Sequence, residues 1–138
     1  MEKIKYKIKY NQPNKFGIYE RAVKQFEVDF EKGIIFTIGN KIYTNQDLSE
    51  DVIIHETTHI KQQSDYGVEE WWDKYFEDDE FRFTQELEAY RNQYNFFQKT
   101  CKDRNKVFEL LKFCAKCLSG TMYGNLCSFD KAVKLIKQ

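Results

Sequence analysis

Two hydrophobic patterns divide the chain into a first third with strand character and a longer remainder with helical character. Residues 3–10 alternate lysine with isoleucine or tyrosine, which is typical of a strand with one buried face. Residues 34–38 and 41–44 are apolar segments joined by a Gly-Asn pair, which tolerates the positive φ angles of a tight hairpin turn. The pattern therefore predicts a small sheet within residues 1–46.

The segment between the first strand and the hairpin shows helical spacing in its first half and strand alternation in its second half. Ile18 and Ala22 have helical spacing, whereas Phe26, Val28 and Phe30 alternate as they would in a strand. The spacing predicts a short helix that is followed by a strand.

From Ser49 onward, apolar residues recur at helical spacing. Ser49 and Ser128 are suitable N-caps, because a serine hydroxyl can accept a hydrogen bond from a free backbone N–H of the first turn. The pattern predicts four or five helices, at about residues 50–64, 68–76, 80–100 and 105–118, with a last one after Ser128.

The fold class that follows is α+β, with a small, mostly antiparallel sheet followed by four to five helices. A chain of 138 residues is short enough for one domain, so we expect a single domain over residues 1–138. Residues 1–46 would form its sheet region and residues 47–138 its helical region. Hydrophobic residues make up 41% of the chain and aromatic residues 17%, which supports a packed core and excludes disorder as the main state.

Charge and composition narrow the partners. The chain has 22 basic and 22 acidic residues, and nucleic-acid affinity comes mainly from an excess of Lys and Arg, so we expect no nucleic-acid partner. The N-terminal residues have no apolar core like that of a secretion signal. The longest uncharged stretch, Cys117 to Phe129, is shorter than the roughly 20 residues that span a membrane. We expect no membrane contact and a cytoplasmic location, or association with a virion if a phage encodes the chain.

The two histidines of the chain lie in one motif, His55-Glu56-Thr57-Thr58-His59. Helix residues four apart share a face, so both imidazoles can bind one metal ion while Glu56 stands beside it. Zinc suits this pattern, because a catalytic zinc with three protein ligands keeps one position for a water whose pKa it lowers. Glu56 would then be the general base. The alternative is a pair of histidines that make hydrogen bonds in the core.

A third protein ligand has to be a carboxylate or a thiolate, since no third histidine exists. Glu86 falls inside the apolar stripe of the long helix, whereas Glu88 points to the opposite side. A buried carboxylate is costly unless a positive group compensates it, so Glu86 is the predicted ligand and Glu88 is predicted to be exposed. The alternative for Glu86 is a buried ion pair with Arg82 or Arg91. The stripe consists of Phe83, Leu87, Tyr90, Tyr94 and Phe97.

The histidine motif and the downstream segment Glu86-Leu87-Glu88-Ala89-Tyr90 together resemble the zincin metallopeptidases, and specifically the gluzincins, in which a glutamate on a second helix completes the zinc site. The resemblance covers roughly residues 34–97 and extends to small bacterial and phage proteins with similar motifs. Ala89, three residues after Glu86, matches the gluzincin pattern, whereas Tyr90 replaces an acidic or amide residue that would orient a zinc-bound histidine. The resemblance implies a minimal zincin-like metalloprotease fold and a zinc-dependent peptidase that acts on a peptide or protein substrate. Its zinc ligands would be His55, His59 and Glu86.

The same resemblance suggests how a substrate would bind. The edge strand of a zincin pairs with an extended peptide, so the hairpin at residues 34–44 is the candidate peptide cradle. Hydrolysis also needs a donor to the developing oxyanion, and without a third histidine we expect a tyrosine. Tyr123 is one candidate among Tyr66, Tyr90 and Tyr94.

Two other functions fit the same residues. The chain could be a structural or interaction protein, such as a phage component, that keeps a zincin scaffold and uses the metal for folding. It could also be a regulatory protease that cleaves a single repressor protein.

The cysteines and tryptophans have simpler interpretations. A Cys-x-x-Cys spacing is compatible with a four-thiolate metal site, but the apolar stripe around it favours reduced cysteines that pack as small hydrophobic residues. Trp71 and Trp72 are adjacent, so we expect only one of them to point inward from a helix. The four cysteines are Cys101, Cys114, Cys117 and Cys127.

Overall fold

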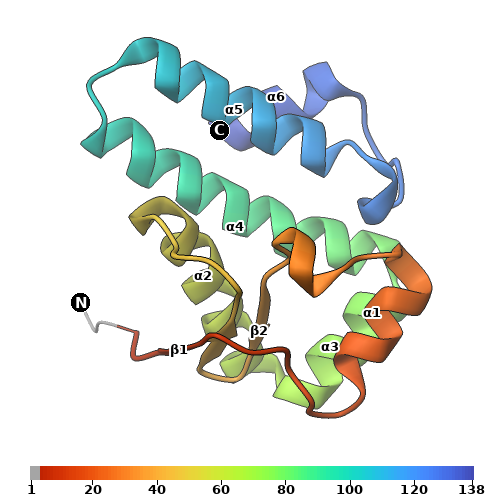
Figure 1. Ribbon diagram of the computed structural model, residues 1–138. Helices are drawn as coiled ribbons and strands as arrows, with labels where there is room; N and C mark the ends of the chain where they lie inside the picture. Colours follow the sequence, from red (N-terminus) through yellow and green to blue (C-terminus); the bar gives the residue numbers. More distant parts are fainter. Residues whose placement is uncertain (1–3) are drawn as a thin grey trace.

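The computed structural model describes residues 4–138, which form a three-stranded sheet and six α-helices (Figure 1). The strands β1 (Lys7–Lys9), β2 (Phe36–Ile38) and β3 (Lys41–Tyr43) lie in the order β1-β3-β2. The predicted α+β class is confirmed. The sheet is mixed, however, because β1 runs parallel to β3 while β2 and β3 form the predicted antiparallel hairpin.

Five helices follow the sheet, within the predicted number, and one short helix precedes the hairpin. Helix α4 crosses the middle of the molecule, with α5 and α6 on one side and α2 and α3 on the other (Figure 1). Two short 3-10 helices, η1 and η2, lie in the connections. The bounds are α1 (Ile18–Phe26), η1 (Phe30–Lys32), α2 (Glu50–Tyr66), α3 (Val68–Glu77), α4 (Asp79–Thr100), α5 (Arg104–Leu118), η2 (Thr121–Tyr123) and α6 (Phe129–Lys137).

The predicted strand at Phe26, Val28 and Phe30 is wrong. Phe26 ends α1, Glu27 adopts a left-handed backbone with φ 56°, and Phe30 begins η1. The Phe26 ring stacks on Phe76 of α3 with centroids 5.9 Å apart. The alternation therefore reflects packing against a helix, and the same segment supplies the long crossover that a parallel β1–β3 pair requires.

The first strand is also shorter than the alternation predicts. Only Lys7–Lys9 pairs with β3, Tyr10 is 61% exposed, and Lys3 lies outside the described residues. Ile8, half-buried opposite Ile42, keeps the predicted inward direction. Because β1 is an edge strand, only β3 can pair with it. The pairing ends before the alternating pattern does.

Both tryptophans of α3 are buried, so the expectation that only one points inward is wrong. Trp71 Nε1 donates a hydrogen bond to Gln85 Oε1 on α4 at 2.8 Å, and Trp72 Nε1 donates to the carbonyl of Thr37 on β2 at 3.1 Å. Helix α3 lies between the sheet and α4, so two adjacent faces of this helix are covered, one for each tryptophan.

The four cysteines are free thiols. Cys114 is fully buried, and burial raises the pKa of its thiol to about 12, as expected of a cysteine that packs as a hydrophobic residue. Within residues 4–138, the groups of side chains able to hold a metal ion include no cysteine. None of the helices within residues 4–138 is both long enough and apolar enough to span a membrane.

Two leucines provide a test of the core. Leu118 at the end of α5 is completely buried, whereas Leu126 is 45% exposed. We expect Leu118→Ala to lower the free energy of unfolding by about 2–5 kcal/mol, because it removes buried methyl groups and leaves a cavity. The matched control Leu126→Ala should cost less than about 1 kcal/mol. Urea denaturation measures both, and equal losses would contradict the placement of the core.

Candidate metal centre

Helix α2 places the two histidines on one face. It begins after Ser49, and the acidic residues Glu50 and Asp51 in its first turn complement the positive end of the helix dipole. His55 and His59 are one turn apart, with ring centroids separated by 5.0 Å, and they are only 8% and 5% exposed. Two neighbouring imidazoles are thereby withdrawn from water.

Glu86 on α4 faces both rings. Its Oε1 lies 3.1 Å from His55 Nε2 and 3.1 Å from His59 Nε2, and the three ligand atoms lie within 4.8 Å of one another. In a tetrahedral zinc site with bonds of about 2.0–2.1 Å, neighbouring donor atoms are about 3.3 Å apart. The two distances from Glu86 Oε1 to the histidine nitrogens are close to that value. Glu88 is exposed, as predicted.

A glutamine determines which nitrogen of His55 carries the proton. His55 Nδ1 lies 2.9 Å from Gln93 Oε1, and Gln93 Nε2 in turn donates to Asp51 Oδ2 at 2.8 Å. Because the amide oxygen can only accept, His55 Nδ1 carries the proton. In the neutral ring, Nε2 then has a free lone pair.

A second glutamine does the same for His59. His59 Nδ1 lies 2.8 Å from Gln62 Oε1, and Gln62 Nε2 donates to the Gln85 carbonyl at 3.0 Å and to Glu88 Oε1 at 2.7 Å. Because both partners of Gln62 Nε2 are acceptors, the amide oxygen of Gln62 is the atom that faces His59. His59 Nδ1 therefore carries the proton and donates it to this oxygen.

The two neutral imidazoles therefore direct lone pairs at a carboxylate oxygen. Three such atoms repel one another unless a cation lies between them, either a metal ion or a proton on a ring. The residues present fit zinc by donor type, number and spacing, with the second nitrogen of each histidine held as in known zinc sites.

Without a metal ion, the negative charge of Glu86 favours a proton on the neighbouring ring of His59. Burial opposes protonation of His59, but the adjacent Glu86 carboxylate outweighs it and raises the pKa of His59 to about 9. Burial likewise disfavours the charged form of Glu86, yet the attraction of His59 and the hydrogen bonds from both rings hold the pKa of Glu86 well below its usual value.

Glu56 lies in the same cavity without joining the three ligands. Its Oε1 accepts a hydrogen bond from the hydroxyl of Thr37 on β2 at 2.8 Å. Glu56, which follows the candidate ligand His55 on α2, therefore places a carboxylate in the cavity, where a general base would be needed.

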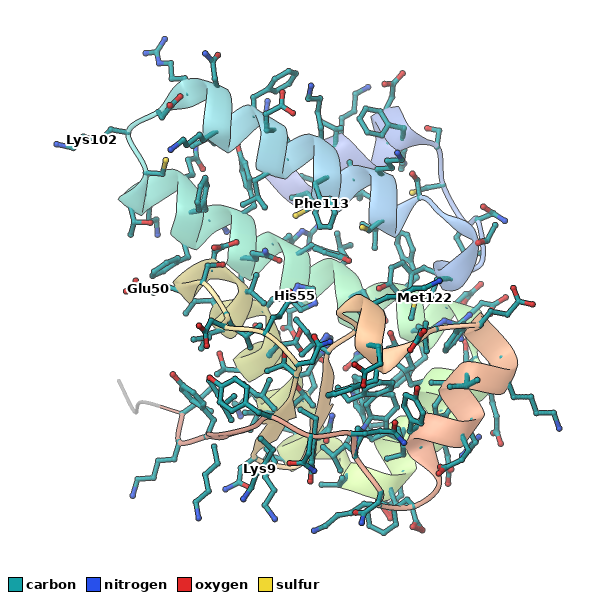
Figure 2. The ribbon with its side chains drawn as sticks, viewed as in Figure 1. Lys9, Glu50, His55, Lys102, Phe113 and Met122 are labelled. Atoms are coloured by element: carbon teal, nitrogen blue, oxygen red, sulfur yellow. The ribbon has the colours of Figure 1, made fainter. Side chains whose placement is uncertain are left out.

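The cavity around these groups has a volume of about 350 Å³. The segment before β2 forms one part of its wall, and α5 and η2 form another. Figure 2 labels His55 together with Phe113 of α5 and Met122 of η2. The walls are mainly apolar, with Ile34, Ile35, Val52, Phe113 and Met122 among the lining residues.

Tyr75 was not identified from the sequence. Its hydroxyl donates to Glu86 Oε2 at 2.5 Å, so both oxygens of Glu86 are engaged. The glutamines were missed as well, although Gln62 follows His59 by three residues and Gln93 follows Glu86 by seven, both helical spacings. Tyr75 has no such signal, because the orientation of α3 against α4 is a tertiary property.

Among the predicted tyrosine donors, Tyr123 and Tyr90 line the cavity. Tyr94 lines a separate cleft and Tyr66 is 47% exposed, so neither reaches the centre. Burial is the main cause that raises the pKa of Tyr123 well above its usual value, which keeps its hydroxyl protonated as a donor.

The alternative ion pairs of Glu86 do not form. Arg82 pairs with Asp79 and donates to the carbonyls of Tyr75 and Met122. Arg91 donates to the Leu135 carbonyl near the end of α6. With both arginines engaged elsewhere, the two histidine rings are the partners of Glu86 Oε1.

Part of the predicted peptide cradle is already occupied. On β2, the Thr37 carbonyl accepts from Gln63 Nε2 at 2.6 Å, and the Gly39 N–H donates to Gln63 Oε1 at 2.8 Å. This side chain takes the place of a neighbouring strand. Of the predicted cradle, Ile34 and Ile35 line the cavity and remain available, together with the preceding residue Gly33.

Comparisons with models of known protein families, with curated proteins and with solved structures gave no match for this chain.

The raised pKa of His59 gives a prediction about pH. In protein treated with a chelator, protonated His59 beside Glu86 stabilises the fold fully below pH 6.5, and this contribution is lost as the pH rises through about 9. We expect the free energy of unfolding of the metal-free protein, measured in urea, to fall over this interval. Zinc affinity should rise about tenfold per pH unit over the same interval, because zinc displaces that proton.

His59→Gln is the control for this experiment. The variant has no titrating imidazole at this position, so its stability should change little over the same pH interval. A metal-free protein whose stability is also constant there would contradict the coupling between His59 and Glu86.

Proposed function

We propose that the chain is a zinc-dependent peptidase in which Glu56 is the general base. The observation that carries the proposal is the convergence of His55 Nε2, His59 Nε2 and Glu86 Oε1 at 3.1 Å, with Glu56 lining the same cavity. Two imidazoles, one carboxylate and a neighbouring base are the groups that metal-assisted hydrolysis requires.

A bound zinc ion would polarise the substrate carbonyl and lower the pKa of a water molecule. Glu56 accepts the proton of the attacking water and passes it to the departing amide nitrogen. Thr37 supports this role, because its hydroxyl holds Glu56 Oε1 at 2.8 Å and leaves Oε2 as the oxygen that exchanges protons.

The bond from Tyr75 favours catalysis over a purely structural site. A structural zinc site is closed by four protein ligands, whereas a catalytic site keeps one position open. Because Tyr75 holds Glu86 Oε2 at 2.5 Å, Glu86 offers a single oxygen to the metal. A bound metal ion would then have three protein donors, from His55, His59 and Glu86, and could take a water molecule as its fourth ligand.

The cavity suggests how the substrate lies. An extended peptide would run along residues 33–35, with its reacting carbonyl at the metal position and a bulky apolar side chain against Phe113 and Met122. Tyr123, and Tyr90 beside it, would donate to the oxyanion that forms on water attack.

A second candidate function is that of an interaction protein, such as a phage component, that uses zinc for stability. The low exposure of the three ligands favours it, since His55, His59 and Glu86 are only 5–8% exposed. Chelation separates the two functions: it abolishes hydrolysis in one case and only lowers the melting temperature in the other.

Glu56→Gln tests the general base. The variant should bind one zinc ion per chain and lose at least about 100-fold in kcat, because an amide accepts no proton. Activity is measured by mass spectrometry on a mixed peptide library with zinc-loaded protein. Glu80→Gln, an exposed change of the same type on α4, should keep full activity. Unchanged hydrolysis in Glu56→Gln would refute the mechanism, and a zinc-loaded parent protein without hydrolysis would favour the structural candidate.

Tyr75→Phe tests the open coordination position. Without the hydroxyl, Glu86 Oε2 is free to approach the metal, so the site should become more highly coordinated. We expect the visible absorption of the cobalt-substituted protein to weaken and kcat to fall more than KM changes, while metal stoichiometry stays at one. Tyr66→Phe, at an exposed position, is the control. An unchanged cobalt spectrum in Tyr75→Phe would show that the hydroxyl does not govern the coordination.

A further inference from the structure

Four lysines gather at the β1 side of the small sheet. Lys7 and Lys9 of β1 are two residues apart and share a face, and Lys7 lies directly opposite Lys41 of β3. Lys15, which precedes α1, is close enough to Lys41 to act on its charge. We call these four residues the lysine patch. Figure 2 shows Lys9 on the opposite side of His55 from Phe113, so the patch lies away from that cavity wall.

The positive charges of the patch are not compensated. None of the ion pairs within residues 4–138 includes a member of the patch, although the chain has as many acidic as basic residues. Repulsion, chiefly from Lys15, lowers the pKa of Lys41. Like charges at opposite positions of a sheet are destabilising, so this arrangement costs stability without a visible structural return.

Protection of the sheet edge explains only part of the patch. Lysines on an edge strand prevent the pairing of one sheet with another, which accounts for Lys7 and Lys9 on β1. Lys41 lies on the central strand β3, and Lys15 lies outside the sheet. These two lysines protect no edge, and Lys15 is the main cause of the lowered pKa of Lys41.

The backbone of β1 offers a second element of recognition. Lys7 N–H and Lys9 C=O are hydrogen bonded toward β3, at 2.9 and 3.0 Å. In a parallel pair the intervening residue, Ile8, directs its N–H and C=O to the other side, where residues 4–138 supply no further strand. An extended segment can therefore pair with this edge.

We propose that the lysine patch and the outer edge of β1 together bind an extended, acidic segment of a partner protein. Side chains on one face of a strand recur every second residue, roughly 6.6–7 Å apart. A segment added beside β1 with Asp or Glu at alternate positions would place its carboxylates next to Lys7 and Lys9, with Lys41 and Lys15 behind them. This surface does not depend on the proposed peptidase function.

The short length of the patch favours an acidic polypeptide over a nucleic acid. A paired strand of three residues matches a few side chains of a peptide, whereas a nucleic acid gains affinity from many phosphate contacts. A long polyanion would also meet the 22 acidic side chains of a chain with zero net charge.

The experiment measures binding of two fluorescent octapeptides to the full chain by anisotropy. One alternates Glu and Thr, and the other has the same composition with four Glu followed by four Thr. We expect the alternating peptide to bind at least about fivefold more tightly, because only its carboxylates match the strand period. Equal affinities would overturn strand addition.

Charge-matched triple variants test the patch itself. Lys7, Lys9 and Lys41 are changed to Gln in one variant, and the exposed Lys99, Lys106 and Lys131 in the other. The patch variant should bind the alternating peptide at least about tenfold more weakly and the control less than about twofold more weakly. Melting temperatures no lower than that of the parent protein verify that both variants are folded.

Equal weakening in the two variants would overturn the patch as the binding surface. So would tighter, patch-dependent binding of a single-stranded oligonucleotide or of phosphatidylserine vesicles, which would identify a different partner class. Repeating the titration with Glu56→Gln separates this surface from the proposed active site, because that variant should bind the alternating peptide like the parent protein.

Discussion

The centre of this structure depends on mutual compensation among three buried polar side chains. A buried carboxylate such as Glu86 costs several kcal/mol unless positive and hydrogen-bonding partners surround it. Here His55 and His59 face one carboxylate oxygen and Tyr75 donates to the other. The outer nitrogen of each ring has its own glutamine partner. Within the described chain no buried polar side-chain atom lacks a partner, so the centre is fully bonded and confined to one arrangement.

The same bonds connect elements that are distant in the sequence. Glu86 and Gln93 join α4 to α2, Tyr75 joins α3 to α4, and Thr37 joins β2 to Glu56 of α2. The centre is complete only when these four elements have packed, so any cation that binds there stabilises the whole arrangement by mass action. The small sheet matters chiefly through β2, whose outward edge is held by side chains of α2 and α3.

Local geometry explains how much of this could be predicted from the sequence. The spacing of the histidines and the inward position of Glu86 follow from the helix period alone, and the structure brings these residues together. Gln93 also has helical spacing, but a glutamine in a helix has many uses, so spacing alone does not identify it. Tyr75 depends on how α3 packs against α4, which no local pattern encodes. The alternation at residues 26–30 misled for a related reason: strand period is informative only where a neighbouring strand exists.

Whether the centre is structural or catalytic depends on what could close its fourth position. Two carboxylate oxygens are near enough in the fold to be considered, Glu86 Oε2 and an oxygen of Glu56. A hydroxyl from a different element engages each of these residues: Tyr75 on α3 binds Glu86, and Thr37 on β2 binds Glu56. A site that served only stability would gain from a fourth ligand, since each added charge-assisted contact strengthens metal binding. The hydrogen bond from Tyr75, which engages Glu86 Oε2, lowers this stability, and it is useful if a water molecule and a substrate have to enter from the cavity.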